Sequence, residues 1–412
     1  MSAFSIPLSG LEATSDSLNV IANNLANLNT DGYKDETLDF ASVFNQVQGT
    51  SGNGDPIQYG NGVQVAGTNS NFSDGNVDTT GIASNMALQG NGFFVVQDAN
   101  GMDYTRNGDF TVNSQGQLCT QDGQLVMGYP AANGVVQTGS ALAPITVNQA
   151  NNIPAVATTD FGMTTNLDAT AAVGTTYSSP VTVYDSLGES QDLTIEYTNT
   201  AANTWTYSIT LPAAATGGTG NPTQIASGTL QFNSSGVLTS PSGSVTGIDV
   251  TGLADGAADM DLTWNLNGSG GVPAITQQAA ASATSATTQN GYSSGTLTGY
   301  QVLSDGTVQG QFSNDQTLAL GQVAVASFAN SEGLTQTANN DYQSSFASGA
   351  AVIGQAEQGG NGTITGGAVE ESNVNLSTEF ANMIVAQQGY EANAKVLTTL
   401  DQVAQATLQV IT

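Results

Sequence analysis

The sequence predicts a multidomain α+β protein in which terminal α-helices enclose antiparallel β domains of sandwich or barrel type. Two observations carry this prediction. Apolar residues recur at helical spacing at both ends of the chain, whereas the middle shows period-two alternation broken by Gly-rich turns. At 412 residues, with roughly 100–200 residues per domain, the chain has room for two to four domains with real cores.

The first helix is predicted from an apolar row near the N-terminus. Its positions alternate in spacing between three and four, as in the seam of a helix that packs against another helix: Leu11, Thr14, Leu18, Ile21, Leu25 and Leu28. Ser9 followed by Glu12 predicts a capping box at the start, and Asp31-Gly32 predicts a stop.

The last helix is predicted from Asn375, a plausible N-cap, to Thr412. Its seam comprises Leu376, Phe380, Met383, Gln387, Tyr390, Ala394 and Leu397, and resumes at Ala404, Leu408 and Ile411. At 1.5 Å per residue this segment makes a rod of about 57 Å, too long to be covered by a small domain. Gly389 is its only glycine and costs about 1 kcal/mol relative to alanine.

The middle of the chain predicts short β-strands. The apolar run at 90–97 is bounded by glycine, and residues 193–197, 205–211 and 262–266 alternate between apolar and polar. Low-complexity tracts at 213–221 and 279–289 predict loops. The expected layout has four parts: a helical inner domain of 1–33 plus 370–412, an extended connector of 34–75, a middle β domain of 76–150 plus 291–369, and an outer β domain of 151–290.

Composition excludes several classes of function. Three bases against 33 acids give a net charge of −30, which repels nucleic-acid phosphates and anionic lipids. No apolar run reaches the roughly 18 residues of a spanning helix, so no membrane insertion is expected. Without His and with only Cys119, the common nucleophile systems and the zinc sites are missing, so we expect no enzyme, no cofactor and no metal. The number of acidic residues does not by itself exclude a hydrolase that works with a pair of carboxylates.

Two single residues carry narrower expectations. Arg106 is the only base between 35 and 394, and we expect it to pair with a nearby acid such as Asp103 or Asp109, with a partner across a subunit interface as the alternative. Cys119 is expected to be a small apolar residue of a strand. The terminal seams predict self-association of many copies, and the alternative is that the two ends form a stalk inside one molecule.

The two ends also resemble bacterial flagellar rod, hook and hook-associated proteins. Residues 21–27 (IANNLAN) with 30–34 (TDGYK) are similar to the N-terminal signature of this group. Residues 370–376 (EESNVNL), 383–387 (MIVAQ) and 390–395 (YEANAK) match its C-terminal one. Residues 182–198 and 300–338 resemble the middle regions of hook proteins. Gly389 departs from the larger residue usual in the group.

The resemblance implies a structural subunit that stacks into a curved tube, a universal joint that transmits torque from rod to filament in motility. It implies an extracellular location in the flagellum, reached by type III export without a cleaved signal peptide. Rod, hook cap, hook-filament junction proteins and export gate would be partners beside many copies of the chain. The assembly interface is expected at Leu11, Leu18, Ile21, Asn23, Asn24, Leu25, Asn27, Leu28, Phe380, Met383, Ile384, Tyr390, Leu397 and Leu408.

Phe40 and Phe44 match an aromatic element that early flagellar substrates present to the export gate. The alternative for this pair is ordinary packing. For the whole chain, the alternatives are a distal rod-like protein and an acidic extracellular adhesin or surface-layer subunit.

Overall fold

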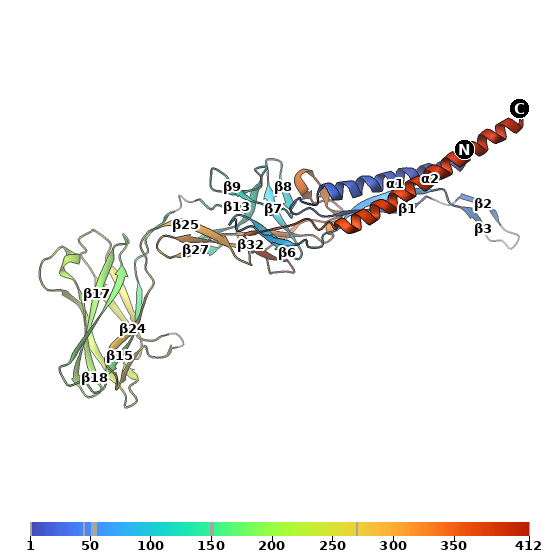
Figure 1. Ribbon diagram of the computed structural model, residues 1–412. Helices are drawn as coiled ribbons and strands as arrows, with labels where there is room; N and C mark the ends of the chain where they lie inside the picture. Colours follow the sequence, from blue (N-terminus) through green and yellow to red (C-terminus); the bar gives the residue numbers. More distant parts are fainter. Residues whose placement is uncertain (1, 44–45, 51–55, 149–151, 269–270, 412) are drawn as a thin grey trace. The chain divides into compact units, whose positions relative to one another are not determined.

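The computed structural model describes residues 2–43, 46–50, 56–148, 152–268 and 271–411 (Figure 1). The chain divides into two compact units. Unit 1 comprises Met1–Asn148, Gly299–Gln311 and Thr317–Thr412, and unit 2 comprises Gln149–Thr298 and Phe312–Gln316. Both chain ends therefore belong to unit 1, and each unit has its own core.

Unit 1 contains the two long helices. Helix α1 (Ser2–Ala26) begins well before Ser9 and includes Pro7, so the predicted capping box is wrong. The Ser9 hydroxyl instead donates to the Ile6 carbonyl and accepts from the Val63 amide. Helix α2 (Leu376–Ile411) begins as predicted, because the side-chain oxygen of Asn375 accepts from the amides of Ser377 and Thr378 at 3.0 and 3.2 Å.

The segment after α1 is a β-ribbon. Strands β1 (Glu36–Ser42) and β4 (Val63–Ser70) pair in antiparallel fashion with a bulge at Asp39/Phe40. Between them lies a second antiparallel pair, β2 (Gln46–Thr50) and β3 (Pro56–Tyr59). The ladder runs alongside α1 (Figure 1).

The remainder of unit 1 is antiparallel β structure built on the predicted run at 90–97. Strand β7 (Phe93–Gln97) lies between β8 (Met102–Thr105) and β11 (Leu125–Ala132), and its four apolar residues are buried. Cys119 is buried in β10 (Leu118–Cys119), as expected. The other strands of this unit are β5 (Val77–Thr79), β6 (Met86–Gln89), β9 (Thr111–Val112), β12 (Val135–Val136), β13 (Ala143–Pro144), β26 (Thr307–Phe312), β27 (Thr317–Val323), β28 (Val325–Ser327), β29 (Thr335–Gln336), β30 (Asp341–Gln343), β31 (Val352–Gly354), β32 (Thr363–Gly366) and β33 (Ala368–Glu370).

Unit 2 contains two five-stranded sheets around a shared core. One sheet consists of β16 (Thr176–Tyr184), β17 (Ser190–Ala201), β18 (Thr204–Leu211), β19 (Thr223–Phe232) and β20 (Leu238–Ser240). The other consists of β15 (Asp160–Asp168), β21 (Val245–Val250), β22 (Met260–Asn265), β23 (Ile275–Gln278) and β24 (Ala283–Gln289). The buried Trp205 and Trp264 belong to one core cluster that both sheets line.

Two details of unit 2 differ from the expectation. Strand β15 pairs in parallel with β22 and β23, so the sheets are not uniformly antiparallel. The tract at 279–289 is a loop only at its start, since its residues from Ala283 onward form β24, which pairs with β15. Strand β14 (Asn152–Ile153) pairs with β25 (Gly295–Val302), at residues close to both ends of the main segment of this unit.

Candidate assembly site: the terminal helix pair and its base

The two terminal helices lie against each other within one molecule (Figure 1). A methyl group on Gly389 would lie 3.2 Å from the Thr14 side chain, and one on Gly10 would lie 2.8 Å from that of Asn393. Glycine therefore permits the close approach of the helices at two places. This accounts for Gly389, and it means that part of each predicted seam is occupied inside the chain.

Large apolar side chains remain exposed on both helices. In α2, Leu376, Phe380 and Ile384 follow one another at intervals of four and form a row, with Ile384 55% exposed. The exposed set on the pair is Phe4, Ile6, Leu8, Leu376, Phe380, Ile384, Val385, Tyr390, Val396, Val403 and Leu408. So many exposed apolar side chains on one structural element are typical of a protein interface.

The predicted interface residues fall into three groups. Phe380, Ile384, Tyr390 and Leu408 are exposed, as is Asn23, while the side chains of Leu11, Leu18, Leu25, Asn27, Leu28, Met383 and Leu397 are half-buried. Ile21 and Asn24 are buried at 6% and 1% exposure. These last two side chains are therefore enclosed by the chain's own fold.

Asn24 fixes the end of α1 to the ribbon that follows. Its side-chain oxygen accepts from the Tyr33 hydroxyl and from the Glu36 amide, both at 3.0 Å, and its nitrogen donates to the Glu36 carbonyl at 2.9 Å. Burial, with nearby carboxylates, raises the pKa of Tyr33, which keeps this hydroxyl a donor. The signature residues Asn24 and Tyr33 thus set the direction in which the chain leaves the helix.

A buried ion cluster lies where four distant segments meet. Lys34 Nζ contacts Glu370 Oε1 at 2.7 Å, and both side chains are fully enclosed. Arg106 Nη1 lies 3.4 Å from Glu370 Oε2 and 3.4 Å from Asp74 Oδ1. The expectation that Arg106 pairs with Asp103 or Asp109 is therefore wrong. Burial lowers the pKa of Lys34, and the neighbouring Glu370 carboxylate opposes that shift.

Backbone groups complete the cluster. Lys34 also donates to the Ser73 carbonyl at 2.7 Å, and the Gly75 amide donates to Glu370 at the same distance. Arg106 donates to the carbonyls of Leu88 and Gly90. Sequence reasoning missed this site, because the sequence does not show that Lys34 and Arg106 are buried and therefore require acidic partners.

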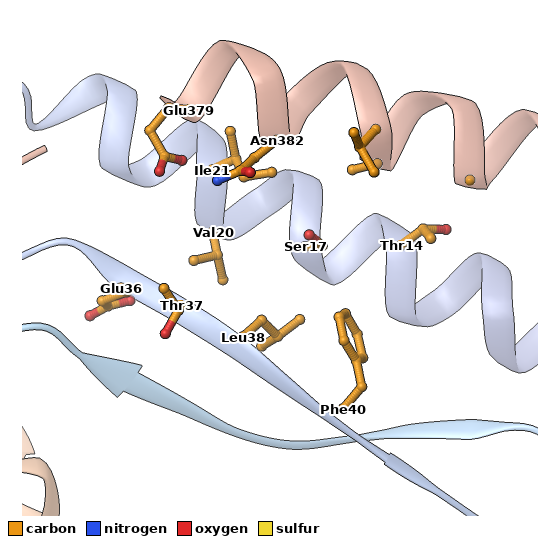
Figure 2. Close-up of a pocket in the computed structure, with 13 residues that line it drawn as sticks. Thr14, Ser17, Val20, Ile21, Glu36, Thr37, Leu38, Phe40, Glu379 and Asn382 are labelled. Atoms are coloured by element: carbon orange, nitrogen blue, oxygen red, sulfur yellow. The ribbon is translucent and has the colours of Figure 1, made fainter. Parts of the chain in front are cut away.

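A pocket of about 400 Å³ opens between α1, β1 and α2 (Figure 2). Leu38 and Phe40 from β1 and Val20 from α1 supply apolar lining. Glu36 and Glu379 lie at one end of it, and no base lines it. Burial raises the pKa of Glu36, so the pocket disfavours uncompensated negative charge.

The structure describes only one residue of the predicted export pair, Phe40. Phe40 lies in β1, is half-exposed and contributes to this pocket. Phe44 falls outside the described residues.

Among the described residues, neither helix combines the length and the apolarity needed to cross a membrane.

Four protein-family models match the chain. They are described as flagella basal body rod protein at residues 6–34, flagellar hook protein FlgE/F/G D1 domain at 87–165, flagellar basal body protein FlaE D2 domain at 149–292, and flagellar basal body rod FlgEFG protein C-terminal at 365–410. Together these matches reach both terminal helices and both units.

Individual relatives agree with the family models. The flagellar hook protein FlgE of Salmonella typhimurium is 38% identical, covering 97% of this chain and 98% of its own length. That of Escherichia coli is 36% identical over the same shares. The crystal structure of Helicobacter pylori flagellar hook protein FlgE2 has a TM-score of 0.54 at 16% identity, covering 70% of this chain and 98% of its own. Because the Salmonella and Escherichia coli relatives are 38% and 36% identical over 97% of this chain, the chain belongs to the bacterial flagellar hook protein family and is a subunit of the hook.

Proposed function

We propose that copies of this chain assemble into the curved tube of the hook and act as a flexible joint that carries torque from the rod to the filament. The exposed apolar row of α2 carries this proposal, because side chains such as Ile384 are left uncovered by the chain's own fold. Each apolar side chain that a neighbouring copy covers contributes about 1–2 kcal/mol.

In this assembly the helix pair forms the inner wall and the β domains lie outside it. We propose the layout given by the sequence, with 1–33 plus 370–412 innermost, 34–75 as connector, 76–150 plus 291–369 in the middle and 151–290 outermost. The outermost part contains ten acids and no base, so neighbouring copies repel one another there and slide rather than adhere. Continuous helix contacts would resist twist while these outer contacts yield.

The finer partners follow from this role. We propose that the chain has no enzymatic activity, that it contacts the rod, the hook cap and the junction proteins at the ends of the tube, and that it reaches the outside of the cell through the flagellar export gate without a cleaved signal. The interface is proposed to comprise the exposed and half-buried apolar residues of both helices.

Electron microscopy of the purified protein under polymerising conditions tests this function. Hollow curved tubes are the expected outcome. Flat sheets would support a surface-layer subunit instead, and a protein that stays monomeric at high concentration would contradict the proposal. Straight, stiff tubes would favour the distal rod-like alternative.

Export is proposed to involve Phe40 and Phe44. Replacing both with alanine is expected to reduce secretion of the chain by about tenfold, measured as protein in the culture medium against total protein. The matched control is Phe346→Ala, since Phe346 is fully exposed and lies far from this pair in the sequence. Unchanged secretion of the double variant would show that Phe40 has no role in export and only packs at the pocket.

A further inference from the structure

The chain can offer almost no positive charge to a neighbour. Of its three bases, all within the described part of the chain, Lys34 and Arg106 are enclosed in the ion cluster. Lys395 of α2 is exposed, and no ion pair involves it among the described residues. In an assembly of identical copies with 33 acids each, Lys395 is therefore the side chain that can neutralise a carboxylate across an interface.

One carboxylate in the helix pair needs such a partner. Glu379 is 6% exposed, and its Oε2 atom is buried without a hydrogen-bond partner among the described residues. The side chain extends from α2 toward α1 at the end of the pocket that also holds Glu36 (Figure 2). An uncompensated buried carboxylate is costly, so a cation arriving at this pocket would be strongly favoured.

Lys395 cannot reach Glu379 of its own chain. Both residues lie on the same straight element, and 16 residues of α-helix separate them by about 24 Å at 1.5 Å per residue. A contact between them must join two molecules. Ala392 and Thr399 share a helix face with Lys395, are exposed and are small enough to lie against the apolar lining of the pocket, which includes Leu38, Phe40 and Val385.

We propose that the pocket between α1, β1 and α2 receives side chains from the α2 helix of a second copy of this chain, with Lys395 of that copy paired with Glu379. The inference rests on the proposed function and specifies which surfaces meet. Because the two surfaces differ, the contact is heterologous, so it can repeat from copy to copy and build an open helical polymer. Contacting copies are then displaced by about 24 Å along the helix direction.

Cysteine cross-linking tests this contact. Asn382→Cys with Thr398→Cys uses two exposed positions with the same separation of 16 residues, one of which lines the pocket. Disulfides require Cα atoms within about 7 Å, so no bond can form inside one chain. We expect assembled tubes under mild oxidation to give a ladder of dimers, trimers and longer chains on a non-reducing gel. The single-cysteine variants are controls, and Cys119 is buried.

Charge exchange tests the ion pair itself. Lys395→Glu is expected to reduce polymer yield at least tenfold while leaving the circular dichroism of the monomer unchanged, since Lys395 is exposed. Lys395→Glu with Glu379→Lys is expected to restore the yield to within about threefold. Glu391→Gln changes an exposed carboxylate of the same helix and serves as the matched control.

The outcomes separate this inference from the function on which it rests. Tubes of the unaltered chain together with a ladder and a rescue support both. Tubes without a ladder, or with a band no larger than a dimer, overturn the pairing and leave the hook function intact. Normal tubes from Lys395→Glu also overturn it. If the unaltered chain forms no polymer, the proposed function and this inference both fail.

Discussion

Lys34 and Glu370 lie 336 positions apart in the sequence and form a buried ion pair at 2.7 Å. Arg106 adds a second positive group on the other oxygen of the same carboxylate. Buried ion pairs are sensitive to loss of one partner, because the remaining charge is left in a medium that solvates it poorly. This cluster therefore determines how firmly the last strand before α2 is held to the segment after α1.

Lys34→Met is expected to lower the free energy of unfolding of unit 1 by about 3–5 kcal/mol, measured by urea denaturation. The cost arises from Glu370, which loses its nearest cation while staying buried. Lys34→Met combined with Glu370→Gln should recover at least half of the loss, since no uncompensated carboxylate remains. A double variant as unstable as the single one would show that packing, and not charge, is responsible.

Asp341 in β30 gives unit 1 a pH dependence. Burial, and then the nearby carboxylates of Asp103 and Asp122, raises its pKa to about 6. Between about pH 4 and pH 6 the folded state holds a proton on Asp341 that the unfolded state has lost. The contribution of this group to the free energy of unfolding therefore rises as the pH falls through this range, and is unfavourable at pH 7.

Asp341→Asn should raise the free energy of unfolding by about 1–2 kcal/mol at pH 7 and by almost nothing at pH 4. Denaturant titrations at pH 4, 5, 6 and 7 would show the difference between variant and parent growing with pH. Asp98→Asn, at an exposed turn where backbone amides lower the pKa of the carboxyl, is the control with the opposite sign. A pH-independent difference would contradict the assignment to Asp341.

At the scale of the element, α2 serves two purposes. One side approaches α1 closely enough that Gly389 contacts Thr14, and another side presents Phe380, Ile384 and Leu376 to the surroundings. Close contacts at Gly389 and Gly10 thus join the helices inside one molecule, and exposed large apolar side chains such as Ile384 are left for contacts between molecules. The two alternatives that the sequence left open, a stalk or a surface for assembly, are compatible in this arrangement.

Ile384→Asp is expected to abolish tube formation while the monomer keeps its melting temperature within about 2 °C, since the side chain is more than half exposed. Placing a carboxylate in an apolar contact costs several kcal/mol for each subunit interface. Sedimentation and electron microscopy would measure polymer yield. Val112→Asp, at an exposed apolar position in β9 outside the helices, is the control and should assemble normally. Equal yields from both variants would remove α2 from the interface.

Leu25 and Met383 lie in the same predicted seams but are less informative positions. Both are half-buried in the single chain, so an aspartate at either one also disturbs the fold that contains it. A loss of assembly at these positions would have two causes, whereas a loss at Ile384 has one. Normal polymers from Leu25→Asp and Met383→Asp would still show that these seams do not carry assembly.

At the scale of the whole molecule, unit 2 has a core of its own that includes Trp205, Trp264 and Leu193. Its chain enters and leaves through paired strands, because Asn152 of β14 lies opposite Thr296 of β25. The two ends of residues 151–290 are therefore close together, and a short linker can replace the segment. Unit 1 retains the helix pair and the ion cluster after such a deletion.

Deletion of 151–290 is expected to spare polymerisation and to change the curvature of the tube, as seen by electron microscopy. The reason is that the helices supply the adhesive contacts, whereas the deleted part presents ten acids to its neighbours and no base. Removing this repulsion should alter how the outer surface lengthens and shortens around a bend. Loss of all polymers from a folded deletion variant would place essential contacts in unit 2.

Local patterns in the amino-acid sequence were enough to predict the helical ends, the buried strands of unit 2, the cap at Asn375 and the family. These features depend on local spacing, which the chain displays directly: seams with a period near 3.6 at the ends, and alternation at Leu193, Trp205 and Leu262. The start of α1 was predicted wrongly, because Ser9 lies inside the helix, where its hydroxyl donates to the Ile6 carbonyl and accepts from the distant Val63 amide.

Long-range packing, which the sequence does not display, sets which charges pair, which glycines lie at helix contacts and which seam residues stay exposed. Arg106 has acidic neighbours at 103 and 109 in the sequence, yet it pairs with Glu370, 264 positions away. The sequence left open whether Gly389 allows a close neighbour or a bend, and the structure places the Thr14 side chain beside it. Periodicity describes one element at a time, whereas burial and ion pairing depend on which distant segments fold against it, and that is decided only when the whole chain is compact.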